Sequence, residues 1–244
     1  MPGSTQRLAG SLEEVAAEVK PLGRDAIAVR MDLTDLTSVD ETIERIHSSW
    51  GPLEVAVNNG RHLGLGISEH ILETPIGGYG KFLMSHAIAP TLIVQKTLPK
   101  MSERGSGTYI TISSAAGTDF NPRRPLGHGG SGLAYRMAKA AGHTIVGSPV
   151  SEYHDAGIRA YNIDPSAVLT ERNSDRLAAL GFDTSRAALP VDIARVVVWL
   201  VTSPTDEVDE RYQYATVSAR KLISEIDTAT GAPGSNNKTS GAEA

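Results

Sequence analysis

The sequence predicts an α/β protein in which a parallel sheet carries helices on both faces. Short apolar runs rich in β-branched residues alternate with longer segments whose apolar residues recur every three or four positions. That alternation is the order of strands and helices in a parallel sheet. Polar or turn residues follow most of the short runs, which indicates a ligand site, because the carboxyl ends of parallel strands meet at one edge.

The composition is that of a globular chain with one sizeable core. The 244 residues are 40% hydrophobic and 21% charged, with a formal net charge of -5. This charge balance argues against nucleic acid or an anionic membrane as a partner. Without cysteine, disulfides and cysteine-bound zinc are excluded. No apolar run reaches the roughly 18 residues of a membrane span and no secretory signal is recognisable, so we expect a cytoplasmic protein.

The first half of the chain predicts three helices and two strands. They are a helix over 11–20, a strand over 26–31, a helix over 38–50, a strand over 53–57 and a helix over 81–101. Capping-box patterns open the first two helices, the second one from Ser38 to Glu41. Pro90 is a candidate kink in the third.

The second half continues the alternation. We expect a strand over 108–112, a helix over 134–154, a strand over 158–163, a helix over 190–200 and a short strand over 214–217. Residues 118–132 and 171–189 are expected to be a polar loop and a partly helical segment. A single domain over 1–227 would precede a disordered tail over 228–244, which is rich in Gly, Ser, Asn and Ala.

A serine, a tyrosine and a lysine form the candidate catalytic group. Ser114 follows an expected strand, and Tyr135 and Lys139 stand four residues apart on the next helix. This spacing places the phenol and the ammonium on one helical face, where the cation should lower the pKa of the phenol. Such a tyrosine can exchange a proton with an oxygen that the serine holds. A surface pair one helical turn apart is the alternative on this spacing alone.

Other expected strands also end in polar or turn residues. Asp32, Asn58 and Pro165 each follow one of them, so a parallel sheet would bring them to the edge that holds Ser114. Asp32 could instead cap the following helix, and Asn58 could serve only to hold its turn.

In this order the motifs resemble those of the short-chain dehydrogenase/reductase family, over about residues 7–205. They read Asp32-Leu33, Asn58-Asn59-Gly60, Ser114, Tyr135-Arg136-Met137-Ala138-Lys139 and Pro165-Ser166-Ala167-Val168-Leu169-Thr170. The resemblance implies a Rossmann-like, doubly wound parallel sheet in three layers, α/β/α. Family members mostly form dimers and tetramers through their long helices, so it also implies a homodimer or homotetramer.

The resemblance further implies an oxidoreductase that moves a hydride between NAD or NADP and a secondary alcohol or its ketone. Tyr135 would be the general acid or base, Lys139 would lower its pKa and hold the nicotinamide ribose, and Ser114 would position the substrate oxygen. Besides Tyr135 and Lys139, the cofactor-binding residues so implied are Asp32, Leu33, Asn58, Asn59, Gly60, Pro165, Ser166, Val168 and Thr170. No histidine shows metal-ligand spacing with carboxylates, so no metal site is expected.

The sequence departs from the family's pattern in places that bear on activity. The family's first strand, glycine-rich phosphate loop, helix and second strand have no counterpart, so we expect an N-terminally incomplete fold in which the strand over 26–31 lacks its neighbour. His86 stands where the family has a catalytic Asn, Ser166 replaces a Gly, and extra residues over 121–130 separate Ser114 from Tyr135. The alternatives are therefore a non-catalytic binding or scaffold protein, or a truncated chain unable to bind the dinucleotide.

One glycine-rich segment could be mistaken for the phosphate loop. Residues 60–66, Gly-Arg-His-Leu-Gly-Leu-Gly, fit Gly-x-x-x-Gly-x-Gly after a strand. The segment that follows is cut short at Thr74-Pro75, before a helix of the required length can form. We therefore interpret residues 60–66 as the loop after the Asn-Asn turn.

Overall fold

The computed structural model of the chain describes residues 12–119, 131–170, 184–204, 208, 212–213 and 216–230. Its centre is a parallel four-stranded sheet in the order β1-β2-β3-β4. The strands are β1 (Val55–Asn58), β2 (Gly107–Ile112), β3 (Ile158–Asp164) and β4 (Thr216–Ser218). The predicted α/β class with a parallel sheet is confirmed.

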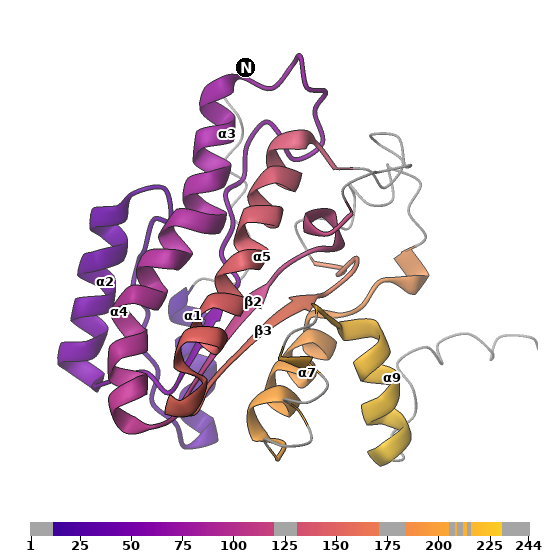
Figure 1. The fold of residues 1–244 in the computed structure, drawn as a ribbon. Coiled ribbons are helices and arrows are strands. Elements are labelled where there is room, and N and C mark those ends of the chain that lie inside the picture. The colour runs from indigo at the N-terminus through magenta and orange to yellow at the C-terminus, as the bar shows by residue number, and fades with distance from the viewer. Residues whose placement is uncertain are drawn as a thin grey trace, which may run out of the picture.

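Helices cover both faces of this sheet, which gives three layers (Figure 1). One face carries α2 (Leu36–Trp50), α4 (Ala89–Arg104) and α5 (Leu133–Tyr153). The other face carries α7 (Pro190–Thr202) and α9 (Ala219–Thr230). Within the described residues no helix is long and apolar enough to cross a membrane.

Neighbouring residues of the central strands serve opposite layers. Tyr109 and Ala160 lie in the core under α2, α4 and α5, whereas Ile110 and Tyr161 lie in the core under α7 and α9. All four are at most 3% exposed. The alternation follows from the period of two of a strand, and each large apolar side chain so buried contributes roughly 1.5–3 kcal/mol. Burial on both faces therefore fixes β2 and β3, and the predicted catalytic residue Ser114 follows the carboxyl end of β2.

The connection from β1 to β2 is a long helical segment with a π turn inside it. Helix α3 (Ile76–Leu83) continues through η2 (Met84–Ile88), which has π geometry, into α4. Pro90 lies at the start of α4, directly after the π turn. The predicted helix over 81–101 is confirmed, although it begins earlier, at Ile76. A π turn inside an α-helix often marks a functional position.

Residues 26–31 are not a strand, so that prediction is wrong. The segment has no regular secondary structure, and within the described residues no strand pairs with it. A strand exists only where a second backbone satisfies its N–H and C=O groups. Among the described residues, the one side-chain partner of this segment's backbone is the Thr42 hydroxyl, which donates to the Arg30 carbonyl at 3.2 Å. Ile27 and Met31 stay 45% and 37% exposed.

Helix α2 is capped by a residue other than the one predicted. It begins at Leu36 because the Asp35 carboxylate accepts a hydrogen bond from the Thr37 N–H at 3.0 Å. The hydroxyl of Ser38 accepts instead from the Asp32 N–H, at 3.0 Å. Neither the capping box from Ser38 nor a cap by Asp32 is present.

The first and the last helix of the described chain are α1 and α9. Helix α1 (Leu12–Val19) confirms the first predicted helix, while its proposed cap at Ser11 lies outside the described residues. Helix α9 was not predicted, and it runs through 228–230, which were assigned to a disordered tail. Residues 231–244, the loop over 121–130 and residues 171–183 lie outside the described part.

Candidate active site

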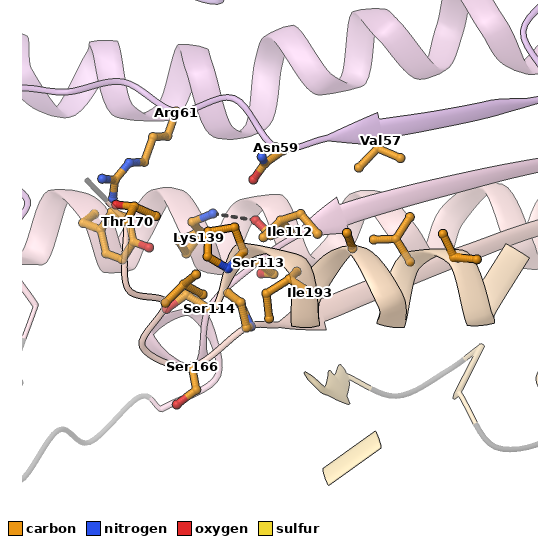
Figure 2. A pocket seen from close by; sticks show the side chains of 17 residues that line it. Val57, Asn59, Arg61, Ile112, Ser113, Ser114, Lys139, Ser166, Thr170 and Ile193 are labelled. Carbon is orange, nitrogen blue, oxygen red and sulfur yellow. Dashed lines mark hydrogen bonds between the residues drawn. The ribbon is translucent and has the colours of Figure 1, made fainter. Parts of the chain in front are cut away.

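A pocket of about 640 Å³ opens at the carboxyl ends of β2 and β3 (Figure 2). Its walls come from these strand ends, from α5 and from the first half of α7. Eight of the residues predicted from the sequence line it, namely Ser114, Tyr135, Lys139, Asn59, Pro165, Ser166, Val168 and Thr170. Segments far apart in the sequence are thus brought together, as expected for the strand ends of a parallel sheet.

Lys139 is held by the backbone at the end of β2. It is only 8% exposed, and its Nζ donates a hydrogen bond to the Ile112 carbonyl at 2.9 Å. Burial and, to a smaller extent, the charge of Arg61 lower the pKa of Lys139 to about 8, and the Asp164 carboxylate opposes the fall. At pH 7 the side chain is therefore still mainly an ammonium, and it loses its proton near pH 8.

Tyr135 packs next to this lysine, one turn earlier on α5. The Lys139 Nζ lies 5.8 Å from the centroid of the Tyr135 ring. Burial raises the pKa of Tyr135, and a hydrogen bond from Ser114 and the charge of Arg61 offset part of the rise. The predicted fall in this pKa is therefore wrong for the protein without ligands. The desolvation of a phenolate outweighs the nearby cation, whose hydrogen bond goes to the backbone.

Ser114 is held in place by a short helical turn. It caps η3 (Ala115–Gly117), and its Oγ accepts a hydrogen bond from the Ala116 N–H at 3.2 Å. Because Oγ accepts there, the hydroxyl proton remains available to the phenol of Tyr135 or to a ligand oxygen. The hydroxyl thus lies where the predicted role, positioning a substrate oxygen, requires it.

A serine–histidine pair braces the strand end behind Ser114. The Nε2 of His143 lies 2.8 Å from the Ser113 Oγ and 3.2 Å from the Ser114 carbonyl oxygen. These two contacts join the ring of His143 on α5 to the segment that follows β2. The pair is therefore a structural support, which sequence analysis did not identify because the two residues are 30 positions apart.

His86 is buried against the tyrosine. It belongs to the π turn η2, is 4% exposed, and its ring centroid lies 5.9 Å from that of Tyr135 at 82°. Its Nδ1 lies 2.8 Å from the Ser85 Oγ, while Nε2 has no partner among the described residues. Burial lowers the pKa of His86 to about 3, so the ring is neutral near pH 7. The residue predicted at the position of the family's Asn is thus in the tyrosine's immediate surroundings.

The turn after β3 contains a strained residue. Ser166 has a φ of 58°, in the left-handed region that favours glycine, and it is the only such non-glycine residue described. Its N–H donates to the Asp164 Oδ1 at 3.1 Å, which stabilises the turn. The turn presents Pro165, Ser166, Val168 and Thr170 to the pocket.

The remaining predicted cofactor residues lie beyond the outer end of the pocket. Leu33, Asn58 and Gly60 line an apolar groove of about 230 Å³ that shares Val57 and Asn59 with the pocket. Asp32 lines neither cavity. Its exposed carboxylate accepts hydrogen bonds from the Thr34 N–H at 2.8 Å and hydroxyl at 2.7 Å, and these lower its pKa.

Residues 60–66 form a loop as interpreted from the sequence. The next helix begins only at Ile76, and Gly66, with a φ of 120°, packs against Phe82 and Ala134. A phosphate loop needs a helix N-terminus directly behind it. Within the described residues no glycine-rich loop of this kind faces the pocket, and no group of three His, Asp or Glu side chains could hold a metal ion.

Arg61 is a pocket residue that sequence analysis missed. It follows Gly60 directly and extends into the pocket toward Thr170 (Figure 2). No hydrogen bond or ion pair joins it to another described residue. The signal was available, because a cation directly after a turn at a strand end is placed to meet a ligand.

The pocket residues fit the nicotinamide end of a dinucleotide. Such a group needs hydrogen-bond donors for a ribose and an apolar wall for a flat ring. Tyr135 and Lys139 supply donors, and Val168, Ile193 and Val197 supply apolar surface. The described residues offer no comparable cradle for a pyrophosphate. The fit therefore concerns one end of the cofactor.

Comparisons with known proteins agree with this geometry. A family model described as short chain dehydrogenase matches residues 4–180. An uncharacterized oxidoreductase of Staphylococcus aureus (strain MW2) is 27% identical over 205 residues, which are 83% of this chain and 82% of that protein. A cyclohexanol dehydrogenase of Rhodococcus sp. (strain TK6) is 26% identical over 208 residues, or 80% of this chain and 73% of that protein.

Solved structures show the same fold. L-sorbose reductase from Gluconobacter frateurii, complexed with NADPH and L-sorbose, superimposes with a TM-score of 0.67 at 24% identity, over 85% of this chain and 79% of that one. A 7α-hydroxysteroid dehydrogenase complexed with NADH and 7-oxo glycochenodeoxycholic acid superimposes with a TM-score of 0.68 at 22% identity, over 85% of this chain and 78% of that one. With the family model matching well over half of its length, the chain belongs to the short-chain dehydrogenase family.

Proposed function

We propose that this protein is an oxidoreductase that interconverts a secondary alcohol and its ketone with a nicotinamide cofactor. The observation that carries the proposal is the convergence of Ser114, Tyr135 and Lys139 in one pocket. Ser114 follows β2, and Tyr135 and Lys139 lie on α5. The pocket has the volume of a small-molecule site.

Tyr135 is the proton-transfer residue in this proposal. Its raised pKa keeps the phenol protonated near pH 7, which is the form that a general acid needs. In the reducing direction the phenol donates its proton to the carbonyl oxygen as that oxygen gains the electron pair of the C=O bond. In the oxidising direction the phenolate removes the hydroxyl proton of the alcohol.

Two neighbours support that transfer. The Ser114 hydroxyl donates a hydrogen bond to the same substrate oxygen and stabilises its developing charge. The Lys139 ammonium stabilises a Tyr135 phenolate electrostatically, and its fixed bond to the Ile112 carbonyl holds it under the ring. The hydride that completes the reaction is supplied or accepted by the nicotinamide ring when a cofactor is bound.

The cofactor is NAD or NADP. Lys139 and Tyr135 would hold the nicotinamide ribose, and the turn over 165–170 would contact the nicotinamide. Asn58, Asn59 and Gly60 would lie along the path toward the adenine end, near Asp32 and Leu33. Support comes from the named ligands of two structures of this fold, NADPH in one and NADH in the other.

The experiment is a titration of the full-length chain with NADPH and NADH, followed by nicotinamide fluorescence and by the melting temperature. A site that is filled at about 100 times its Kd stabilises the fold by roughly 2.7 kcal/mol. We expect one cofactor to raise the melting temperature, and Lys139→Met to weaken this effect. If neither cofactor has an effect at millimolar concentration, the proposal fails.

A second candidate is a protein that retains the fold and binds ligands without redox chemistry. The observation that favours it is the outer edge of β1, to which no described strand pairs. A cofactor-dependent consumption of ketone that Tyr135→Phe abolishes would exclude it. Cofactor binding without such consumption, across a panel of cyclic and linear ketones, would favour it.

Three further expectations stay predictions. They are a single domain over 1–227, a homodimer or homotetramer through the long helices, and a cytoplasmic location. Sedimentation of the purified chain would measure the second directly.

A further inference from the structure

Among the residues that the structure describes, the pocket lining contains two cationic side chains and no acidic one. Arg61 and Lys139 are among its lining residues, together with the hydroxyl-bearing residues Ser113, Ser114 and Tyr135. The Asp164 carboxylate acts electrostatically on Lys139 and Tyr135, and it already accepts a hydrogen bond from the Ser166 N–H. The described part of the lining is therefore positive and rich in donors.

Lys139 cannot be the main partner of a ligand anion. It is buried, it is bonded to the Ile112 carbonyl, and it belongs to the proton-transfer group. Arg61 differs in each respect. It is exposed, it projects into the pocket (Figure 2), and no described residue forms an ion pair or hydrogen bond with it. A guanidinium presents a planar fork of donors that matches a carboxylate in two places.

The position of Arg61 indicates which molecule carries that carboxylate. Arg61 lines the same pocket as Ser114, Tyr135 and Lys139 (Figure 2), and its charge lowers the pKa values of Tyr135, Lys139 and His86. An anion beside Arg61 therefore lies in the pocket that holds the Tyr135 phenol. The molecule whose oxygen exchanges a proton with this phenol is the substrate.

We propose that Arg61 is a substrate-binding residue and that the substrates are small hydroxy acids and the corresponding keto acids, bound through their carboxylate. The inference rests on the proposed function and names its substrate class. Binding the carboxylate at Arg61 leaves the alcohol or ketone oxygen to Ser114 and Tyr135. It also relieves the repulsion between the two pocket cations.

A pair of probes that differ only in charge tests this. 3-Hydroxybutyrate carries a carboxylate where 1,3-butanediol carries a neutral CH₂OH group. Both are titrated into the full chain by NMR, without cofactor, so that binding is measured and turnover is not needed. The variants are Arg61→Gln, Arg61→Lys and Arg45→Gln, the last being an equal loss of charge at an exposed position of α2 outside the pocket.

We expect wild type to bind 3-hydroxybutyrate more tightly than 1,3-butanediol. Arg61→Gln should weaken hydroxybutyrate binding about tenfold, the size of one charge-assisted hydrogen bond, and leave butanediol unchanged. Arg61→Lys should keep part of the affinity, and Arg45→Gln should keep all of it. Unchanged melting temperatures would show that the variants are folded.

Three results would overturn the proposal. The first is no preference of the wild type for hydroxybutyrate, and the second is an equal loss of both probes in Arg61→Gln. The third is found with inorganic pyrophosphate as an added probe. If Arg61→Gln weakens the binding of pyrophosphate and leaves the binding of hydroxybutyrate unchanged, the arginine binds the cofactor and not the substrate. Because no cofactor is present in the hydroxybutyrate titrations, a failure of the cofactor titration above would not affect this outcome.

Discussion

Residues 12–33 and the strand pair β2–β3 differ in how they are held. The central strands are buried on both faces and place Ser114 and Pro165 at the pocket. Residues 12–33 contain no fully buried side chain, and Leu12, Leu22 and Ile27 are 59%, 77% and 45% exposed. The groups proposed for proton transfer therefore have a rigid support. The residues predicted for the adenine end, Asp32 and Leu33, do not.

The central strands can hold catalytic side chains in fixed positions, whereas residues 12–33 cannot. Catalysis needs its groups fixed before the substrate arrives, and packing on both faces of a sheet achieves this. A ligand end that meets a loosely packed segment must order that segment on binding, which costs affinity. We therefore expect the pocket to contribute most of the cofactor affinity of this chain.

Removing the hydroxyl of Tyr135 should have the largest effect of all, and this effect should be on turnover. Tyr135→Phe keeps the ring contacts with Phe82 and His86 but leaves no proton to transfer. Turnover should fall about a thousandfold. Cofactor affinity, measured by nicotinamide fluorescence, should change little. A variant with nearly full turnover would move the proton-transfer role to another group.

A matched pair of leucines tests the contrast in packing. Leu200 of α7 is fully buried and Leu12 of α1 is 59% exposed. Leu200→Ala should lower the free energy of unfolding by about 2–5 kcal/mol, whereas Leu12→Ala should change it by less than about 0.5 kcal/mol. Urea denaturation measures both. Equal losses would show that residues 12–33 are as well packed as the central layers.

The buried Lys139 should make the stability of the protein depend on pH. The pKa of Lys139 is lowered from 10.5 to about 8 on folding. Above the lower value the unfolded chain holds a proton that the native protein has lost, so stability rises with pH through this window. Relative to that of Lys139→Met, the free energy of unfolding of the wild type should rise by about 2–3 kcal/mol between pH 7.5 and pH 10. If the difference in unfolding free energy between wild type and Lys139→Met does not vary with pH, the Lys139 ammonium is hydrated in the native protein.

Relieving the strained turn should give the smallest effect. Ser166→Gly removes the cost of a left-handed φ of 58° while keeping the backbone hydrogen bond to Asp164. The free energy of unfolding should rise by about 0.5–1 kcal/mol, after the entropy of the added glycine is subtracted. As a control, Ser48→Gly in the exposed part of α2 should lower it by a similar amount. A loss of stability in Ser166→Gly would show that the hydroxyl has a role that outweighs the strain.

The sequence was informative where the signal is local. Periodicity located β1 to β4 and most of the helices, and the four-residue spacing placed Tyr135 and Lys139 on one face of α5. It could not show that residues 26–31 lack a partner backbone, because an apolar run has the same appearance with or without one. Helix α9 was missed although Leu222, Ile223 and Ile226 have helical spacing, since the polar tail beside them obscured it.

Two properties of the site depend on the folded surroundings. Spacing alone suggested that Lys139 lowers the pKa of Tyr135, whereas burial of the phenol has the larger influence. The place of Arg61 directly after a strand-end turn indicated contact with a ligand, but a loop without periodicity does not show which way the side chain points. Sequence analysis named Ser38 and Asp32 as possible caps of α2, whereas Asp35 is the cap and the Ser38 hydroxyl bonds the Asp32 N–H.

Hydrogen exchange with and without saturating cofactor tests the central claim most directly. The claim is that the pocket at the ends of β2 and β3 is the cofactor and substrate site. Bound NADPH or NADH should slow exchange in peptides that cover 112–118, 133–140 and 165–170, and leave residues 24–31 much less affected. Unchanged exchange in all three peptides under saturating binding, or protection confined to residues 24–31, would contradict the account.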